Sequence, residues 1–229
     1  MEFIQEGFVQ AIALLLNRDP ATFSAVSVTL RTSGLALTAS LLIGIPLGYL
    51  LGYFDFRFKK QLRTIVDTLL SLPTVFIGLM LYAFLTRKGP LGEAGLLFTI
   101  PGIAIGQAIL ALPIVIALTA TAVEAVDRNL RLTLMSLGAN RRQIAVSTLW
   151  EVRLGILAAA VTATGRVLTE VGISLMVGGN IKWHTRTITT AIALETSKGE
   201  FGMGIALGLV LLLIALTINI TLAGLRRRI

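Results

Sequence analysis

The sequence predicts an all-α integral membrane protein that crosses the bilayer about five times. Of its 229 residues, 55% are apolar and only 14% are charged, whereas a soluble domain carries about 25% charged residues. The apolar residues are gathered into several long stretches separated by shorter polar ones. A stretch of about 18 or more apolar residues is long enough for a helix to cross the hydrocarbon core of a bilayer. The pattern therefore indicates that most of the chain is surrounded by lipid.

The first 19 residues are predicted to form an interfacial helix rather than a secretory signal. Residues 3–16 have the pattern of an amphipathic helix, and the Arg-Asp-Pro run at 18–20 is typical of a helix end. Glu2 and Glu6 stand where a signal peptide carries positive charge. The alternative is that this segment crosses the membrane as a sixth span.

Five later segments are predicted to span the membrane, namely 24–54, 65–85, 97–126, 154–177 and 203–225. The first contains Gly44, Pro46 and Gly48, and the second contains Pro73. Glycine and proline inside spans are tolerated where neighbouring helices satisfy the freed backbone groups. The pattern therefore favours a bundle that lines a path over a simple membrane anchor.

The charges between the spans predict the orientation of the chain. Basic residues gather in the connection 55–63, in the segment 127–153 and in the tail 226–228, and the alternate connections carry half as many. Positively charged loops remain in the cytoplasm, which places the N-terminus outside and the C-terminus inside. The same rule accounts for the formal net charge of +8 without a nucleic-acid partner.

The segment 127–153 is the part of the sequence that most clearly indicates a function. Leucines at helical spacing lead to Gly138, and a second apolar pattern begins at Ile144. Two short helices that meet at a glycine turn form a compact basic knob, which can insert into a groove of a soluble partner. The residues predicted to make that contact are Leu132, Leu134, Leu137, Gly138, Ala139, Arg141, Arg142 and Ile144. The alternative is an ordinary amphipathic connector.

This segment resembles the cytoplasmic coupling loop of ABC importer permeases. The run Leu137-Gly138-Ala139 and its continuation at 141–144 match that loop. The Glu-Ala-Ala triplet of the family is replaced by residues 132–134, and the Trp-Glu pair at 150–151 stands where a proline is usual. The missing glutamate affects the salt link that such loops make to the ATPase. The apolar residues that insert into the ATPase are still present in this loop.

Four further motifs are similar to molybdate and tungstate permeases and fit the tungstate branch best. They are Gly-Ile-Pro-Leu-Gly at 44–48, Ser-Leu-Pro-Thr-Val at 71–75, Gly-Arg-Val-Leu-Thr-Glu-Val-Gly at 165–172 and Gly-Gly-Asn-Ile at 178–181. Together with the coupling loop, Thr-Leu-Arg at 29–31 and Thr-Arg-Thr at 185–187, they cover nearly the whole chain in order. The resemblance implies the type I ABC importer permease fold in the cytoplasmic (inner) membrane of a prokaryote, transporting tungstate or molybdate.

The resemblance also implies partners. Such permeases work as a pair of identical subunits, with two ATPase subunits on the cytoplasmic side and an oxyanion-binding protein outside. The ATPase uses ATP with magnesium, so this chain is expected to bind no cofactor and to be no enzyme. Consistently, the sequence has no phosphate-binding loop motif. With no cysteine and one histidine, a cysteine or multi-histidine metal site is excluded as well.

The translocation path is expected to carry hydroxyls and few fixed charges. Ser71, Thr74 and Thr169 are candidate hydroxyls, and the alternative for each is a bond to its own helix carbonyl. Arg166 and Glu170 are four residues apart within a predicted span, where ionisable groups are costly and usually face the protein interior. They belong either to the path and its gate or to an internal ion pair.

Two rival functions predict other features. A gradient-driven secondary anion transporter or channel is the main alternative. It predicts an internal repeat with paired broken spans, and no internal repeat is visible in the sequence. A membrane-embedded enzyme needs a catalytic constellation, and none is visible either. Within the preferred class, sulfate is a further candidate substrate.

Overall fold

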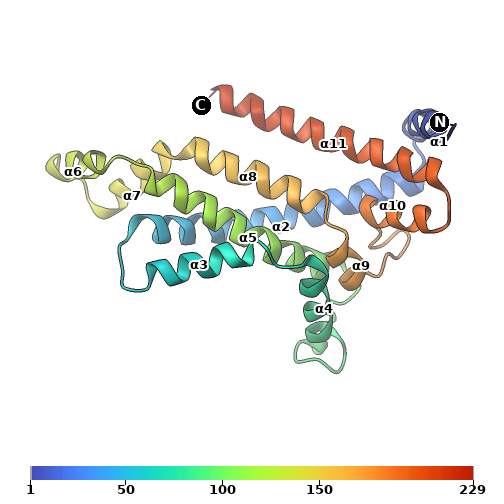
Figure 1. Ribbon diagram of the computed structural model, residues 1–229, viewed down its shortest axis with the longest axis horizontal. Helices are drawn as coiled ribbons and strands as arrows, with labels where there is room; N and C mark the ends of the chain where they lie inside the picture. The colour runs from blue at the N-terminus through green and yellow to red at the C-terminus, as the bar shows by residue number, and fades with distance from the viewer. Residues whose placement is uncertain (1, 229) are drawn as a thin grey trace.

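The protein is a bundle of helices along one long axis, as the computed structural model of residues 2–228 shows (Figure 1). The helices along that axis are α2 (Pro20–Tyr53), α3 (Lys59–Leu69), α5 (Ile100–Glu124), α8 (Arg153–Leu168) and α11 (Phe201–Arg228). One end is crossed by α1 (Glu2–Leu16), and the opposite end carries α6 (Arg128–Ser136) and α7 (Arg141–Glu151). The remaining elements are α4 (Thr74–Leu85), η1 (Gly92–Ala94), α9 (Gly172–Gly178) and α10 (Ile188–Ser197). No strand occurs among the described residues, so the predicted all-α class is confirmed.

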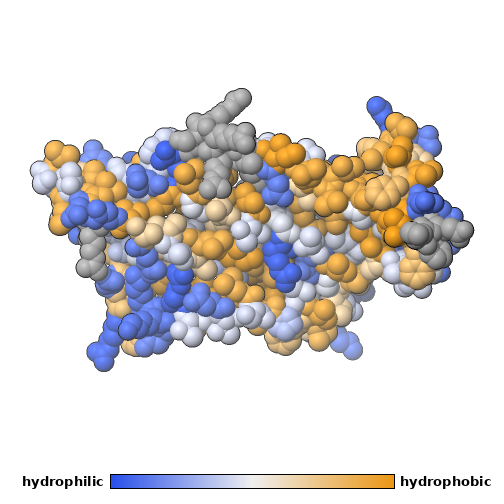
Figure 2. Space-filling view, turned by 45° about the horizontal axis from the view of Figure 1, so that its top comes forward, coloured by the Kyte–Doolittle hydropathy of each residue, from blue (hydrophilic) through white to orange (hydrophobic). Residues whose placement is uncertain are grey.

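Three helices are long and apolar enough to cross a bilayer on their own, namely α2, α5 and residues 201–221 of α11. Two pairs of helices pass the same test together but are bent at a short break, α3 with α4 by 95° and α7 with α8 by 62°. By length and composition, the part of the chain that the structure describes therefore holds three to five candidate spans. Hydrophobic residues cover much of the visible face, and hydrophilic residues gather toward the end that carries α6 and α7 (Figure 2).

The span predicted at 65–85 is interrupted by a sharp bend. α3 ends at Leu69 and α4 begins at Thr74. Pro73 lies between them, and a proline supplies no backbone N–H and disfavours a helical conformation of the residue before it. The chain therefore turns before Pro73 and starts a new helix, and α4 points away from the bundle (Figure 1).

The helix predicted over 154–177 is corrected to two separate helices. α8 ends at Leu168, and α9 starts afresh at Gly172. The new start is stabilised by Glu170, whose Oε1 accepts a hydrogen bond from the N–H of Ile173 at 3.0 Å. A carboxylate at this place satisfies a backbone donor that a helix start leaves free. The polar residue within the predicted span therefore interrupts the helix instead of continuing it.

α1 packs against the first turns of α11. A Cβ added to Gly7 of α1 would lie 2.5 Å from the Ile205 side chain and 3.3 Å from the Gly202 carbonyl oxygen. The 15 residues of α1 extend for about 22 Å as a helix, which is less than the hydrocarbon thickness of about 30 Å. The length argues against a sixth span, and an interfacial position of α1 stays a prediction.

α2 and α5 form the most extensive helix pair and approach each other through small residues. The side of α2 that faces α5 carries them at every fourth position, as Ser40, Gly44, Gly48 and Gly52. A Cβ on Gly48 would lie 2.8 Å from the Ile116 carbonyl oxygen, and one on Gly52 would lie 2.6 Å from that of Ala120. Small residues at this spacing let two backbones come close in a membrane. The glycines of the first predicted span are therefore packing residues.

Replacing Gly48 with alanine is expected to destabilise the protein by about 1–3 kcal/mol, the usual cost of overpacking. The added methyl group would overlap a backbone oxygen and the Thr119 side chain, which forces the two helices apart. Gly34→Ala in the same helix is the control, because a Cβ there meets nothing within 4 Å. Thermal unfolding in detergent measures the difference, and equal midpoints for the two variants would contradict the packing role of Gly48.

Candidate functional site

The segment 127–153 folds as two short helices, α6 and α7, joined by a tight turn at Gly138. Gly138 has φ +78°, a left-handed conformation that residues with side chains rarely adopt. The N–H of Gly138 donates to the Met135 carbonyl, and that of Ala139 donates to the Leu134 carbonyl, both at 3.0 Å. The turn predicted from the sequence is therefore present, and the backbone conformation explains the glycine. We call residues 127–153 the knob.

The start of α7 is capped by its own side chains. Asn140 Oδ1 accepts from the Gln143 N–H at 2.9 Å, and Gln143 Oε1 accepts from the Asn140 N–H at 2.8 Å. Such a reciprocal pair satisfies two donors that the helix start leaves free. Arg141 and Arg142 lie between the two capping residues with exposed side chains. The shape of the knob is thus stabilised by local bonds before any partner binds.

The knob presents an apolar surface. Leu137 is 78% exposed, Leu132 is 63% exposed and Met135 is 55% exposed. Leu134 is half-buried, whereas Ile144 is buried. Of the residues predicted to contact a partner, Ile144 therefore packs inward and stabilises the knob itself.

Two further apolar residues, on α7, are exposed and were missed from the sequence. Val146 is 59% exposed and Trp150 is 69% exposed. Their spacing of four residues places them on one side of the helix, which is a signal that the sequence contains. The Arg153 guanidinium lies 5.2 Å from the centre of the Trp150 ring and donates to the Trp150 carbonyl at 2.8 Å. The exposed Trp150 side chain is therefore held in place by Arg153 of the same chain.

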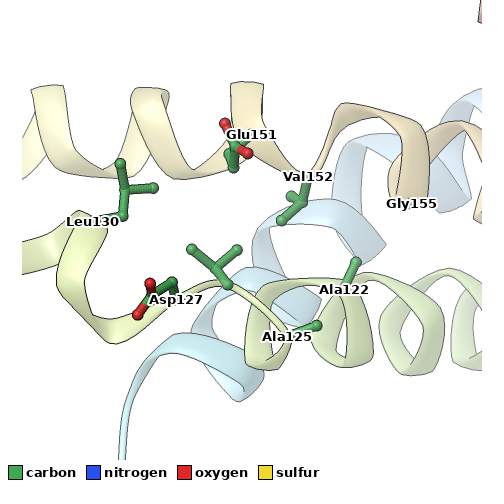
Figure 3. A pocket seen from close by; sticks show the side chains of 8 residues that line it. Ala122, Ala125, Asp127, Leu130, Glu151, Val152 and Gly155 are labelled. Atoms are coloured by element: carbon green, nitrogen blue, oxygen red, sulfur yellow. The ribbon is translucent and has the colours of Figure 1, made fainter.

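A hollow of about 400 Å³ lies at the root of the knob (Figure 3). Its walls are the end of α5, the link to α6 and the junction of α7 with α8, and Asp127 and Glu151 contribute carboxylates. In the wall of the hollow, α5 and α8 approach each other through small residues, since a Cβ on Gly155 would lie 2.5 Å from that of Ala122. The knob therefore joins the bundle beside an open hollow.

The two interrupted segments, 65–85 and 154–177, meet at their breaks. α4 packs on α9, and a Cβ on Gly172 would lie 3.2 Å from the Thr74 hydroxyl oxygen. Ser71, in the turn before α4, is exposed, and Thr74 is half-buried. The structure therefore brings Thr74, with Ser71 three residues before it, to the start of α9.

Arg166 and Glu170 form no ion pair among the described residues. Because α8 ends at Leu168, their spacing no longer puts them on one helix face. Glu170 is 3% exposed, and its backbone carbonyl accepts a hydrogen bond from the Thr189 hydroxyl at 2.9 Å. Arg166 is exposed in the last turn of α8. The buried carboxylate therefore stabilises the link between α8 and α9, and the arginine faces outward from the single chain.

The candidate hydroxyls differ in whether they already donate a hydrogen bond within the protein. The Thr169 hydroxyl donates to the carbonyls of Gly165 at 3.0 Å and Arg166 at 3.3 Å, which is the alternative considered for it. Ser71 and Thr74 have no side-chain hydrogen bond within the described part of the chain. The groups that can donate to an anion without breaking such a bond are therefore Ser71, Thr74 and Arg166.

A charged contact between helices was also not predicted from the sequence. In the sequence, Lys59 and Arg63 indicate only the orientation of the chain. In the structure both reach Glu124, the last residue of α5, at 3.2 Å for Lys59 and 3.7 Å for Arg63. The two cations and the carboxylate lie far apart along the chain, so no local pattern predicts their contact.

Residues 44–229 match a family model described as the inner membrane component of binding-protein-dependent transport systems. The chain is 48% identical to the tungstate uptake system permease protein TupB of Campylobacter jejuni over 227 residues, which cover 99% of this chain and 95% of that protein. It is 31% identical to the molybdenum transport system permease protein ModB of Escherichia coli K12 over 198 residues, which cover 82% of this chain and 86% of that protein.

Among solved structures, the inward-facing MetNI methionine ABC transporter has the same fold, with a TM-score of 0.73 at 19% identity over 92% of this chain and 98% of that chain. The predicted importer permease fold is therefore confirmed. So is the resemblance to molybdate and tungstate permeases.

Proposed function

Because the chain belongs to the family of inner membrane components of binding-protein-dependent transport systems, we propose that it forms the translocation path for tungstate in an ATP-driven importer. The assignment of tungstate as the substrate rests on the high sequence identity to a tungstate permease over nearly the full length of both chains. The identity to a molybdenum permease is lower and covers less of the chain. Molybdate is the second candidate, because it is also a tetrahedral dianion.

Other subunits complete the importer. The family depends on a binding protein, which we assign to the end of the molecule that carries α1 and α10, away from the knob. Two ATPase subunits bind at the knob, and ATP with magnesium stays on them, so this chain contributes no nucleotide site. The N-terminus then lies outside and the C-terminus in the cytoplasm, as the basic segments near the knob favour.

A second copy of the chain closes the path. Ser71 and Arg166 are exposed in the single chain rather than enclosed by it. A charged side chain at the centre of a lipid-facing helix costs about 2.5–3.5 kcal/mol or more, so an exposed arginine in a span requires water or protein around it. Two copies that face each other across α8 and the break before α4 supply both.

Arg166 is the group of the path that meets the oxyanion. Its guanidinium carries five N–H donors, and no carboxylate pairs with it in the portion of the chain described. Hydrogen bonds from an ionised donor to an anion are about twice as strong as neutral ones. A single cation from each subunit attracts a dianion and still lets it leave, since the external binding protein supplies the selectivity.

The knob transmits the work of the ATPase. Leu137, Leu132 and Met135 offer the apolar plug, although the glutamate usual in this loop is absent. The hollow at its root leaves room for the knob to move relative to α5 and α8. Energy therefore reaches the path by mechanical contact, in keeping with the absence of a nucleotide-binding motif from the sequence.

The function is tested by reconstituting the chain with its ATPase and binding protein in vesicles. We expect uptake of radiolabelled tungstate that requires ATP, with weaker uptake of molybdate and little of sulfate. Vesicles without ATP but with an imposed proton gradient are the control. Uptake driven by that gradient alone would contradict the importer function and favour the secondary transporter.

Arg166→Gln is expected to lower tungstate uptake by about tenfold at subsaturating substrate, because it removes a charge-assisted contact worth about 1.5 kcal/mol. Arg166→Lys keeps the charge and retains part of the activity. Arg87→Gln, which removes an exposed arginine from the connection after α4, is the control. Wild-type uptake by Arg166→Gln, with all variants assembled to the same level, would rule out the anion contact.

Leu137→Ser is expected to weaken the binding of the ATPase by at least about tenfold, because a leucine buried at an interface contributes about 1.5–3 kcal/mol. Leu91→Ser is the matched control, since Leu91 is also exposed (52%) but lies in the connection after α4. The fraction of ATPase that co-purifies with each variant measures the effect. Equal fractions for both variants would show that the knob is only a connector.

A further inference from the structure

A cluster of charged side chains joins the ends of three helices at the base of the knob. Lys59, the first residue of α3, lies 3.2 Å from the Glu124 carboxylate at the end of α5, and its Nζ donates to the Gly52 carbonyl of α2 at 3.2 Å. Arg63, one turn further along α3, lies 3.7 Å from the same carboxylate and donates to the Thr121 hydroxyl of α5 at 2.6 Å. One carboxylate of α5 therefore contacts two cations of α3, and Arg63 Nε also lies 3.5 Å from the Asp67 carboxylate of its own helix.

Two partners in this cluster, Lys59 and Glu124, are placed unfavourably for their own helices. Cations in the first turn of a helix oppose its macrodipole, as do acids in the last turn. Lys59 begins α3 and Glu124 ends α5. No side-chain cap stabilises the start of α3, and the last turn of α5 holds no basic residue. The charges therefore gain from each other across the helices, which indicates that the contact itself has a role.

The cluster is not fully closed. Arg63 Nη1 is buried and has no hydrogen-bond partner among the described residues, although the Glu124 carboxylate lies 3.7 Å away. A hydrogen bond forms at about 2.7–3.2 Å, so an approach of α3 toward α5 by about 0.5–1 Å would complete it. Lys59 and Glu124 also line a hollow of about 730 Å³ whose other walls include α6. Open space therefore lies between the cluster and the knob.

We propose that Glu124 is a positioning residue that transmits movement of the knob to α3, and through α3 to the break before α4. Glu124 is the last residue of α5, and the knob begins at Asp127. α3 leads directly to Ser71 and Thr74 at the break. When the ATPase moves the knob, the end of α5 shifts, the cluster closes and α3 follows. This proposal rests on the import function, because it needs a motor at the knob and a path at the break.

The test is Glu124→Gln in the complete importer with its ATPase and binding protein. Glutamine keeps the size of the side chain and removes its charge. We expect ATP hydrolysis near the wild-type rate, while tungstate taken up per ATP falls by about fivefold, the population shift that loss of a partly exposed ion pair produces. Glu124→Asp keeps the charge and restores most of the uptake per ATP. Joint loss of assembly and hydrolysis in Glu124→Gln would assign the residue to folding and overturn the proposal.

Two controls isolate the contact between the helices. Asp55 is 87% exposed and pairs with Lys59 at 3.5 Å from the stretch just before α3, so Asp55→Asn leaves the α3–α5 contact intact and keeps wild-type uptake per ATP. Adding Lys59→Gln to Glu124→Gln lowers uptake per ATP no further, because both act through one contact. Equal uptake per ATP in wild type and Glu124→Gln would overturn the role of Glu124 in transmitting movement and leave the import function standing. Absence of ATP-dependent uptake in wild type overturns the import function itself.

Discussion

The close approach of α2 and α5 is the constraint on which the rest of the fold depends. Apolar helices gain little hydrophobic free energy from each other in lipid, so close packing contacts must hold them together. Glycines at every fourth position bring the backbone of α2 against Val115 and Thr119 of α5. Ala163 and Val167 of α8 then pack in the same buried cluster. α3 joins α5 through Glu124 and through Val66, which is buried in one cluster with Ala117 and Ala120. The α2–α5 pair is thus the frame to which the other helices are attached.

The two breaks are tolerated because their backbone groups are satisfied within the protein, as irregular structure at membrane depth requires. At the α8–α9 break, the Glu170 carbonyl accepts from Thr189 and the Glu170 carboxylate accepts from the N–H of Ile173. The start of α10 is bonded to the frame as well, since the N–H of Ile188 donates to the Thr29 hydroxyl of α2 at 2.9 Å. The structural polar groups at this break are therefore buried and bonded, whereas Arg166 in the last turn of α8 is exposed.

Local patterns in the sequence predict local structure well, and they fail where distant segments meet. The glycine turn at Gly138 follows from residues next to it in the chain. The pairing of Arg166 with Glu170 assumed a helix that continues past Leu168, but Glu170 is used to start α9 instead. The contact of Lys59 and Arg63 with Glu124 depends on the packing of α3 against α5, which no local pattern contains. The unfavourable position of Lys59 at a helix start was the signal that could have suggested a distant carboxylate.

The weakness of the cluster around Glu124 suits a contact that changes in every transport cycle. Partly exposed ion pairs contribute about 0–1 kcal/mol, whereas separating a fully buried pair leaves an uncompensated charge and costs about 3–5 kcal/mol. The exposed fractions of 21% for Lys59, 26% for Arg63 and 38% for Glu124 place this cluster in the first class. A contact of that strength can open and close with little loss of energy. The glycine packing of α2 on α5 is buried and close, and it is the part of the structure that must stay unchanged while α3 and the knob move.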